Sequence, residues 1–196
     1  MDTAPDIEGN RMKKISIIFV LVFLIQNFGS VLRAEDQTLK FEQPLLITSA
    51  GQSAEVQLAN VLAKRAGLTA TLTKLATEKD IENVKTVVLV LGISLKGLGA
   101  AGLDVTQEKE RVIALLEAAK SGSTPVLCLH LGGEARRGQI SDELIELCLP
   151  YAAAVLLVKS GNGDGFFTKL CREKNISLIE VERTVDAITP LQNLFK

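Results

Sequence analysis

The chain has 196 residues, with 22 Lys and Arg against 23 Asp and Glu, and its formal net charge is −1. It contains seven Phe, one Tyr and no Trp, so it lacks the clustered cations and aromatic stacking surfaces of a nucleic-acid-binding protein. We therefore expect no nucleic-acid partner. The length suits one domain of ordinary size plus a short segment at one end.

Residues 1–34 are predicted to be an N-terminal extension and a secretory signal peptide. The sequence from Met12 has two lysines, an apolar run over 15–25 and small residues leading to Ala34, the pattern of a cleaved export signal. A membrane anchor is the less favoured alternative, because the run is about half of the roughly 20 residues that span a bilayer. We expect translation to start at Met12, cleavage after Ala34, only transient membrane contact and an extracytoplasmic location.

Residues 35–42 are predicted to be a linker, and residues 43–196 a single α/β domain. Apolar runs of strand length alternate with segments of helical period, which is typical of repeated βαβ units and a parallel sheet. The expected strands are 45–49, 70–72, 86–91, 125–130, 154–159 and 176–181. The third to fifth are almost entirely apolar, as are strands buried on both faces.

The expected helices lie between and after these strands. They cover 53–66, 104–120, 141–149 and 164–175, and a last one follows Thr189-Pro190. Asp104 with Gln107 three residues later forms a capping-box pattern at the start of the second. We predict a three-layer, doubly wound, mainly parallel sheet of flavodoxin-like or Rossmann-like architecture. The expected strand order is 2-1-3-4-5, with the sixth strand at the edge beside the fifth.

Gly97, Gly99 and Gly102 have the G-x-G-x-x-G spacing of a dinucleotide-binding fingerprint. In that fingerprint the helix begins inside the motif, directly after the strand. Here four residues separate Gly92 from Gly97, and the capping pattern at Asp104 follows the last glycine. We therefore predict a loop and no bound dinucleotide or other cofactor. The glycines allow either a close approach to a ligand or a tight crossing between packed loops.

Small residues, hydroxyls and cations gather in the loops that follow the strands. These loops read TSAGQS, GISLKGLGAAG, HLGGEARRGQIS and KSGNGDG. In a parallel sheet they share the carboxyl edge, where ligands bind at the point of strand-order reversal. The four cations there, Lys96, Arg136, Arg137 and Lys159, are either solvated surface charges or countercharges for a ligand carboxylate or phosphate.

The leading functional hypothesis is therefore recognition of a small anionic metabolite at this edge. The candidate ligand-binding residues are Ser49, Gly51, Gln52, Ser53, Ser94, Lys96, Gly97, Gly99, His130, Gly132, Gly133, Arg136 and Arg137. Ser49 and Ser53 have a second interpretation, because they could simply cap the helix that follows.

Two other functions stay open, and whether the chain is an enzyme is undecided. In a hydrolase or transferase, His130 would act as acid or base and Ser49 or Ser53 as nucleophile. Yet G-x-S-x-G is absent, no acid has the expected position of a triad, and a lone histidine is commonly structural. The third hypothesis is a protein-interaction module that binds no small ligand.

Cys128, Cys148 and Cys171 are an odd number of cysteines without paired spacing. They are expected to be buried free thiols rather than a disulfide framework. Together with the single histidine they do not have the spacing of metal ligands, so no metal is expected.

Four segments carry a resemblance to a known family: LLITSAGQSAEVQLANVLAKRAGL, GISLKGLGAAGLDV, HLGGEARRGQISD and KSGNGDGFFTKL. Together they resemble an uncharacterised family of exported bacterial α/β proteins, described only as a domain of unknown function. The resemblance covers nearly all of residues 43–196. It implies a bacterial extracytoplasmic protein and supports a site at one edge of the sheet, but it implies no reaction, substrate or cofactor.

Overall fold

The computed structural model describes residues 40–195. The predicted extension and signal peptide, and most of the predicted linker, lie outside the described residues. Within residues 40–195, no helix has both the length and the apolar character needed to cross a membrane.

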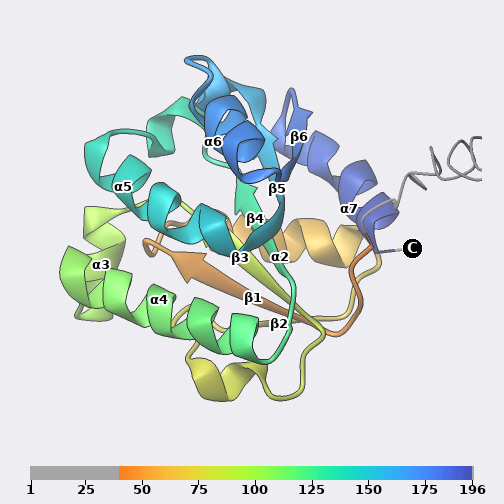
Figure 1. The fold of residues 1–196 in the computed structure, drawn as a ribbon, viewed down its shortest axis with the longest axis horizontal. Coiled ribbons are helices and arrows are strands. Elements are labelled where there is room, and N and C mark those ends of the chain that lie inside the picture. Colours follow the sequence, from red (N-terminus) through yellow and green to blue (C-terminus); the bar gives the residue numbers. More distant parts are fainter. Residues whose placement is uncertain (1–39, 196) are drawn as a thin grey trace, which may run out of the picture. The chain divides into compact units, whose positions relative to one another are not determined.

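Six parallel strands form the central sheet in the order β2-β1-β3-β4-β5-β6 (Figure 1). This confirms the predicted strand order and the doubly wound α/β class. The strands are β1 (Leu45–Ala50), β2 (Ala70–Leu72), β3 (Thr86–Leu91), β4 (Val126–His130), β5 (Ala152–Val158) and β6 (Ser177–Val181). Their bounds agree with the expected ranges to within two residues.

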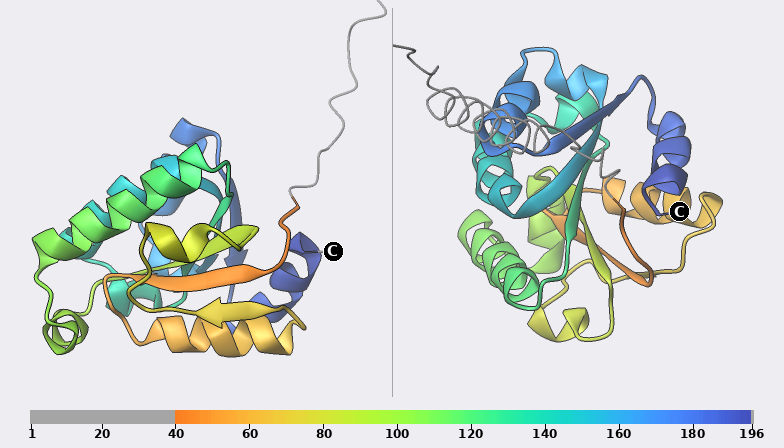
Figure 2. Two further views of the ribbon diagram at one scale, coloured as in Figure 1. Left: turned by 90° about the horizontal axis from the view of Figure 1, so that it is seen from below. Right: turned by 45° about the vertical axis from the view of Figure 1, so that its right-hand side comes forward.

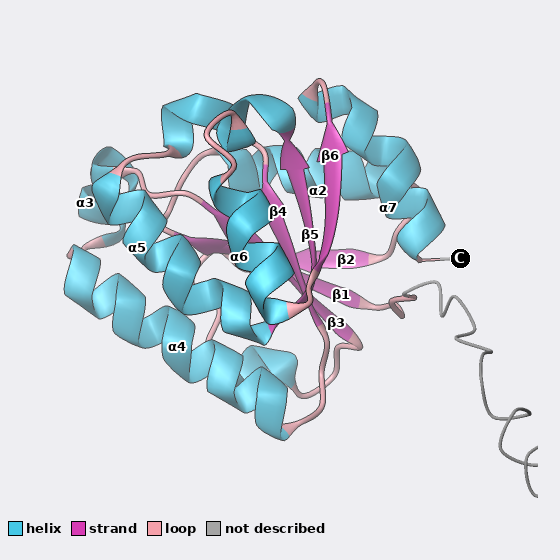
Figure 3. Ribbon diagram, turned by 45° about the horizontal axis from the view of Figure 1, so that its top comes forward, coloured by secondary structure: helices cyan, strands magenta, loops and turns pink. Residues whose placement is uncertain are grey.

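Helices cover both faces of the sheet and complete three layers (Figures 2 and 3). One face carries α2 (Glu55–Arg65) and α7 (Ile188–Leu194), and the other carries α3 (Leu95–Ala101), α4 (Val105–Ser121), α5 (Gln139–Cys148) and α6 (Phe166–Lys174). Single-turn 3-10 helices occur at Glu78–Ile81, Gly133–Arg136, Leu149–Tyr151, Lys159–Asn162 and Thr184–Ala187.

The alternation of side chains along β3 shows why its sequence is apolar throughout. Leu89 and Leu91 pack into the core beneath α3 to α6, while Val88 and Val90 pack into the core beneath α2 and α7. Since successive side chains of a strand point to opposite faces, a central strand covered on both faces has no polar side.

The capping box predicted at Asp104 is confirmed. Asp104 Oδ1 accepts a hydrogen bond from the Gln107 backbone N–H at 2.8 Å, and Gln107 Oε1 accepts one from the Asp104 N–H at 3.0 Å. These two bonds satisfy donors that the first turn of α4 would otherwise leave without a partner.

The prediction that the glycine motif is a loop was wrong. Gly97 and Gly99 lie within the short helix α3, and Gly102 ends that helix with a φ of 70°. Ser94 caps α3, because its hydroxyl oxygen accepts a hydrogen bond from the Gly97 N–H at 3.1 Å. The chain thus forms two helices in succession, and the cap at Asp104 belongs to the second.

Other helix starts also differ from the expected ones, and α2 and α6 each begin two residues later than predicted. Helix α5 begins at Gln139, and Ser141 does not cap it but accepts a hydrogen bond from the Ile93 N–H at 3.1 Å. Helix α7 begins at Ile188, so Pro190 lies inside its first turn. Proline is tolerated there because first-turn N–H groups have no acceptor within the helix.

Candidate functional site

The loops after β1 and β3 meet where the strand order reverses, and they close that part of the carboxyl edge. Gln52 forms an antiparallel bridge with Ile93, and the Ser94 N–H donates to the Gly51 carbonyl at 2.8 Å. A Cβ at Gly51 would lie 2.5 Å from the Gly92 carbonyl oxygen. Backbone therefore fills the crevice in which ligands of such folds commonly bind.

Gly97 belongs to the same crossing, because a Cβ there would overlap the Gln52 carbonyl oxygen. Of the two interpretations left open for the glycines, tight loop packing accounts for Gly51 and Gly97, whereas Gly92 has a φ of 141° and a Cβ there would lie 3.1 Å from Arg136 Cβ. Gly99 is different, since nothing lies within 4 Å of the position that its Cβ would take.

A buried ion pair holds the first loop in place, and the sequence analysis missed it. Glu108 of α4 is fully buried, and its Oε1 accepts hydrogen bonds from the Gly51 N–H at 2.7 Å and from Gln52 Nε2 at 3.0 Å. Arg111 donates to both Glu108 oxygens at 2.9 Å and also to the Ser49 carbonyl at 2.5 Å. The Gly51 amide is therefore committed to the protein itself.

A periodic signal could have revealed Glu108. The buried residues of α4 are Glu108, Val112, Leu115, Leu116 and Ala119. Their spacing puts Glu108 on the same face of the helix as the buried apolar residues. A charge in such a position needs a partner, because burying an unpaired charge is costly.

Ser49 and Ser53 are both buried, and neither acts as the predicted helix cap. Helix α2 follows Ala54, and no side chain caps it. The Ser49 hydroxyl has no hydrogen-bond partner among the described residues.

His130 is fully buried at the end of β4. Its Nδ1 lies 3.3 Å from the Leu91 carbonyl oxygen and its Nε2 lies 3.0 Å from that of Gly133, while its ring lies 5.0 Å from that of Phe167. Burial lowers the pKa of His130, and the two backbone contacts only partly offset this effect. The structure places neither Ser49 nor Ser53 in hydrogen-bonding contact with the imidazole, so a nucleophile and base pair is not assembled.

The lowered pKa of His130 should make the free energy of unfolding depend on pH. His130 is the only histidine, and its pKa is lowered in the folded state, so the unfolded chain takes up a proton first as pH falls below about 6.5. The free energy of unfolding should therefore decrease from about pH 6.5 downward, at a slope of at most ~1.4 kcal/mol per pH unit. Urea denaturation between pH 7.5 and 5.5 measures it.

The variant His130→Gln is the control for this slope. It should be less stable at every pH but nearly insensitive to pH in that window. Equal slopes for the two proteins would mean that another group titrates there.

Three of the four cations expected to attract an anion are paired with carboxylates. Arg136 Nε lies 3.0 Å from Glu55 Oε2, Lys159 Nζ lies 2.8 Å from Glu182 Oε1, and Arg137 is paired twice. Lys96 is exposed on α3. The positive excess that the sequence suggested is thus offset by carboxylates, one of them near in sequence and three from other segments of the chain.

Arg137 has hydrogen bonds to more partners than the other three cations do. Its Nε and Nη2 donate to the two oxygens of Asp142 at 2.7 and 3.1 Å, and its Nη1 and Nη2 donate to those of Asp164 at 3.1 and 3.0 Å. Nη1 also donates to the Gly161 carbonyl, and the guanidinium lies 4.2 Å from the centre of the Phe166 ring. Both carboxylates therefore bind the guanidinium in a bidentate manner.

The two carboxylates differ in exposure. The side chain of Asp164 is 61% exposed, against 26% for Asp142 and 11% for Arg137. The hydrogen bond from Arg137 lowers the pKa of Asp164 to about 2. Burial alone would lower the pKa of Arg137, but the hydrogen bonds to Asp142 and Asp164 more than offset it and raise the pKa.

Two pockets at the carboxyl edge share Arg137 and Gly138. The first, of about 340 Å³, is lined by Glu134, Arg137, Gly138, Asp142, Ser160, Gly163 and Asp164. The second, of about 380 Å³, is lined by Ile93, Leu95, Arg137, Gly138, Gln139, Ile140 and Ser141. Space for a ligand is therefore present at the expected edge, but beside the loop after β4 rather than at the β1–β3 crossing.

Among the other predicted site residues, Gly133 opens the 3-10 helix after β4 with a φ of 59°, and Gly132 immediately precedes it. A Cβ at Gly132 would overlap the side chain of Arg136. Gly132 thus leaves room for the Arg136 side chain, and the carbonyl of Gly133 contacts His130. Neither glycine lines either carboxyl-edge pocket.

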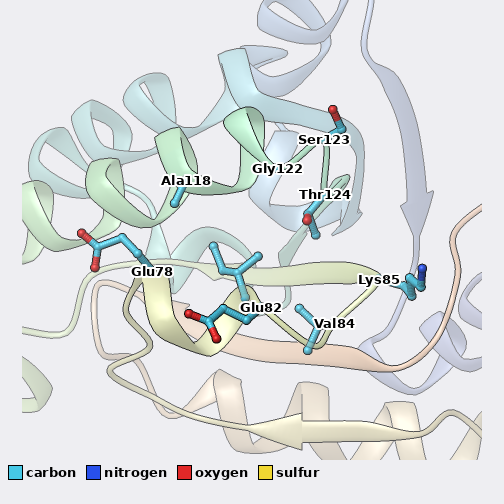
Figure 4. A pocket seen from close by; sticks show the side chains of 9 residues that line it. Glu78, Glu82, Val84, Lys85, Ala118, Gly122, Ser123 and Thr124 are labelled. Carbon is cyan, nitrogen blue, oxygen red and sulfur yellow. The ribbon is translucent and has the colours of Figure 1, made fainter.

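A third pocket, of about 390 Å³, lies at the opposite, amino edge of the sheet (Figure 4). It is bordered by the segment before β3 and the end of α4. Glu78, Glu82 and Lys85 stand apart around its rim. Its polar groups therefore do not converge on a common point as those around Arg137 do.

The three cysteines are free and buried in the core beneath α3 to α6, as predicted. Burial raises the pKa of Cys171 to about 11, so its thiol is protonated at neutral pH. Over residues 40–195, no group of three His, Cys, Asp or Glu side chains is arranged to hold a metal ion.

Comparison with known proteins gives a family and no activity. The family model described as "Domain of unknown function (DUF6305)" matches residues 42–195. No curated protein matches the sequence.

The similar solved structures have low sequence identity and TM-scores below 0.5. A hydroxyethylthiazole kinase from Pyrococcus horikoshii OT3 has 15% identity and a TM-score of 0.47, over 69% of this chain and 54% of the kinase, so the match spans about half of that protein. The esterase AlinE4, of the SGNH-hydrolase family, has 13% identity and a TM-score of 0.31, over 81% of this chain and 83% of the esterase. Neither similarity supports an inference about activity.

Proposed function

This chain belongs to the family described as Domain of unknown function (DUF6305), and we propose that its domain binds a small molecule through a carboxylate or phosphate held by Arg137. The observation that carries the proposal is the position of Arg137 in the wall of both carboxyl-edge pockets, with a solvent-exposed carboxylate on its outer side. Residues 1–34 lead us to place this binding outside the cytoplasm.

Arg137 suits the role better than its neighbour Arg136. Asp142, the Gly161 carbonyl and the Phe166 ring hold the Arg137 guanidinium in one orientation, which leaves one edge of its planar fork toward Asp164. A fixed fork loses little freedom when it binds a carboxylate or phosphate. Arg136 contacts Glu55 through Nε alone and lines neither pocket.

Asp164 occupies the position that a ligand anion would take. Its carboxylate makes the same two parallel hydrogen bonds that a ligand carboxylate would make. Asp164 is the more exposed of the two carboxylates that bind Arg137, and solvent screening weakens an exposed ion pair. Asp164 is therefore the carboxylate that a ligand anion displaces, and the remaining contacts of the ligand decide its affinity.

Removing the Asp164 charge should strengthen anion binding. In Asp164→Asn, Oδ1 can still accept the hydrogen bond from the Phe166 N–H, but the competing carboxylate is gone. We expect succinate and inorganic phosphate to bind about two- to fivefold more tightly, the equivalent of an exposed ion pair. Isothermal titration calorimetry at low ionic strength measures this.

The matched pair Arg137→Gln and Arg136→Gln supplies the control. Binding should be lost in the first and kept in the second. Tighter binding of amines than of anions, weakened in Asp164→Asn, would instead assign the pocket to a cation held by Glu134, Asp142 and Asp164. Wild-type anion affinity in Arg137→Gln would also contradict the proposal.

A further inference from the structure

The second carboxyl-edge pocket has three large apolar side chains in its lining. Apart from Arg137 it contains no charged residue, and its apolar side chains are Ile93, Leu95 and Ile140. Leu95 is 63% exposed, more than any other large hydrophobic side chain among the described residues, and Ile140 is 40% exposed. Arg137 thus lines both a pocket with several carboxylates and a pocket whose other side chains carry no charge.

This apolar wall is built by elements that are tied together. The Ile93 N–H donates to the buried hydroxyl of Ser141, which joins the loop after β3 to the first turn of α5. Ile93 also pairs with Gln52 in the loop crossing. Contacts within the protein therefore hold the wall together, as is usual for small-molecule sites.

Leu95 and Ile140 differ from scattered exposed hydrophobic residues. Single exposed apolar side chains are ordinary on protein surfaces, as is Leu147, which is 40% exposed on α5 and lines none of the three pockets described above. Leu95 and Ile140 come from two different helices, α3 and α5, and meet at one pocket beside a cation.

We infer that the ligand is an amphipathic acid: a monocarboxylate or monophosphate with a short apolar chain. This inference rests on the proposed function of Arg137. The anionic group binds the guanidinium in place of Asp164, and the chain lies over Ile93, Leu95 and Ile140. Both the charge of Arg137 and the absence of other charges from the second pocket match this class of molecule.

A series of straight-chain carboxylates tests the inference. Acetate, butyrate, hexanoate and octanoate are titrated into the protein at fixed pH and ionic strength, with 1-hexanol and hexylamine as chain-matched compounds without the anion. Affinity for the acids should rise by about two- to fourfold per methylene, which is up to the full value for a buried CH₂, until the pocket is filled. The alcohol and the amine should bind more weakly than hexanoate.

The variant Leu95→Ser locates the effect. It should flatten the dependence on chain length and leave acetate affinity unchanged, because Leu95 does not contact the anion. Leu147→Ser is the matched control and should behave as the wild type, since Leu147 is also an exposed helical leucine but does not line the pocket.

Each opposite result has its own meaning. Arg137-dependent binding that is equal for all four acids overturns the amphipathic ligand and leaves the anion site standing. Binding that grows with chain length but is unaffected by Leu95→Ser and Arg137→Gln places the acids elsewhere and overturns the inference. Failure of every acid and of phosphate to bind overturns the proposed function as well.

Discussion

Replacing Glu108 by alanine is expected to lower the free energy of unfolding by about 3–5 kcal/mol, the usual cost of removing one partner of a buried ion pair. The variant leaves Arg111 without its countercharge. It also removes the acceptor of the Gly51 N–H and of Gln52 Nε2. Chemical denaturation at neutral pH measures the change, and the loop after β1 should lose protection from hydrogen exchange.

A control and a double variant separate pairing from helix effects. Glu110 lies on the same helix, is exposed and makes no ion pair within the described residues, so Glu110→Ala should change stability by less than about 0.5 kcal/mol. The double variant Glu108→Ala/Arg111→Ala should lose clearly less than the sum of the two single variants, because it leaves no unpaired buried charge. Strict additivity would show that the two side chains do not act as a pair.

Two alanine substitutions in one short helix are expected to have opposite signs. Gly97→Ala places a methyl group against the backbone carbonyl of Gln52. Because neither backbone segment can move as freely as a side chain, the variant should destabilise the protein by about 3 kcal/mol, at the upper end for overpacking. Gly99→Ala meets open space and should stabilise by about 0.5–1 kcal/mol, because alanine is the better helix former. Thermal and urea denaturation of the two variants give both signs.

The pair also tests the origin of the glycine motif. If Gly97 were needed for a ligand rather than for loop packing, Gly97→Ala would keep wild-type stability and lose only binding. Destabilisation of both variants would instead indicate that α3 does not form as described.

The closed crossing explains why the candidate site is displaced from the point of strand-order reversal. Gly51 and Gly92 bring two loops into backbone contact there, and Glu108 binds the amide that a ligand could otherwise have used. The open space lies one loop further along the sheet, around Arg137. A ligand bound as we propose would approach the loops after β3, β4 and β5 and the start of α5.

Local sequence determined most of the fold. The strands are apolar runs of the right length, the Asp104–Gln107 pair marks the start of α4, and the alternation of strands and helices leads to a parallel, doubly wound sheet. These signals act over a few residues, because they depend on side-chain period and on capping hydrogen bonds. The short helix α3 was missed because the capping pattern at Asp104 indicated a helix start after the glycines, and the nearby cap at Ser94 was not recognised.

The pairing of the charged side chains around the candidate site was decided mainly by the tertiary structure. Arg136 and Glu55 are 81 residues apart, and Arg137 and Asp164 are 27 apart, so no local pattern reveals these two pairs, although Asp142 lies only five residues from Arg137. The sequence by itself determined that small residues and cations would gather at one edge of the sheet. Which of them face a pocket, and which only hold loops together, depends on contacts between distant segments, since pairing and burial are set by how those segments pack.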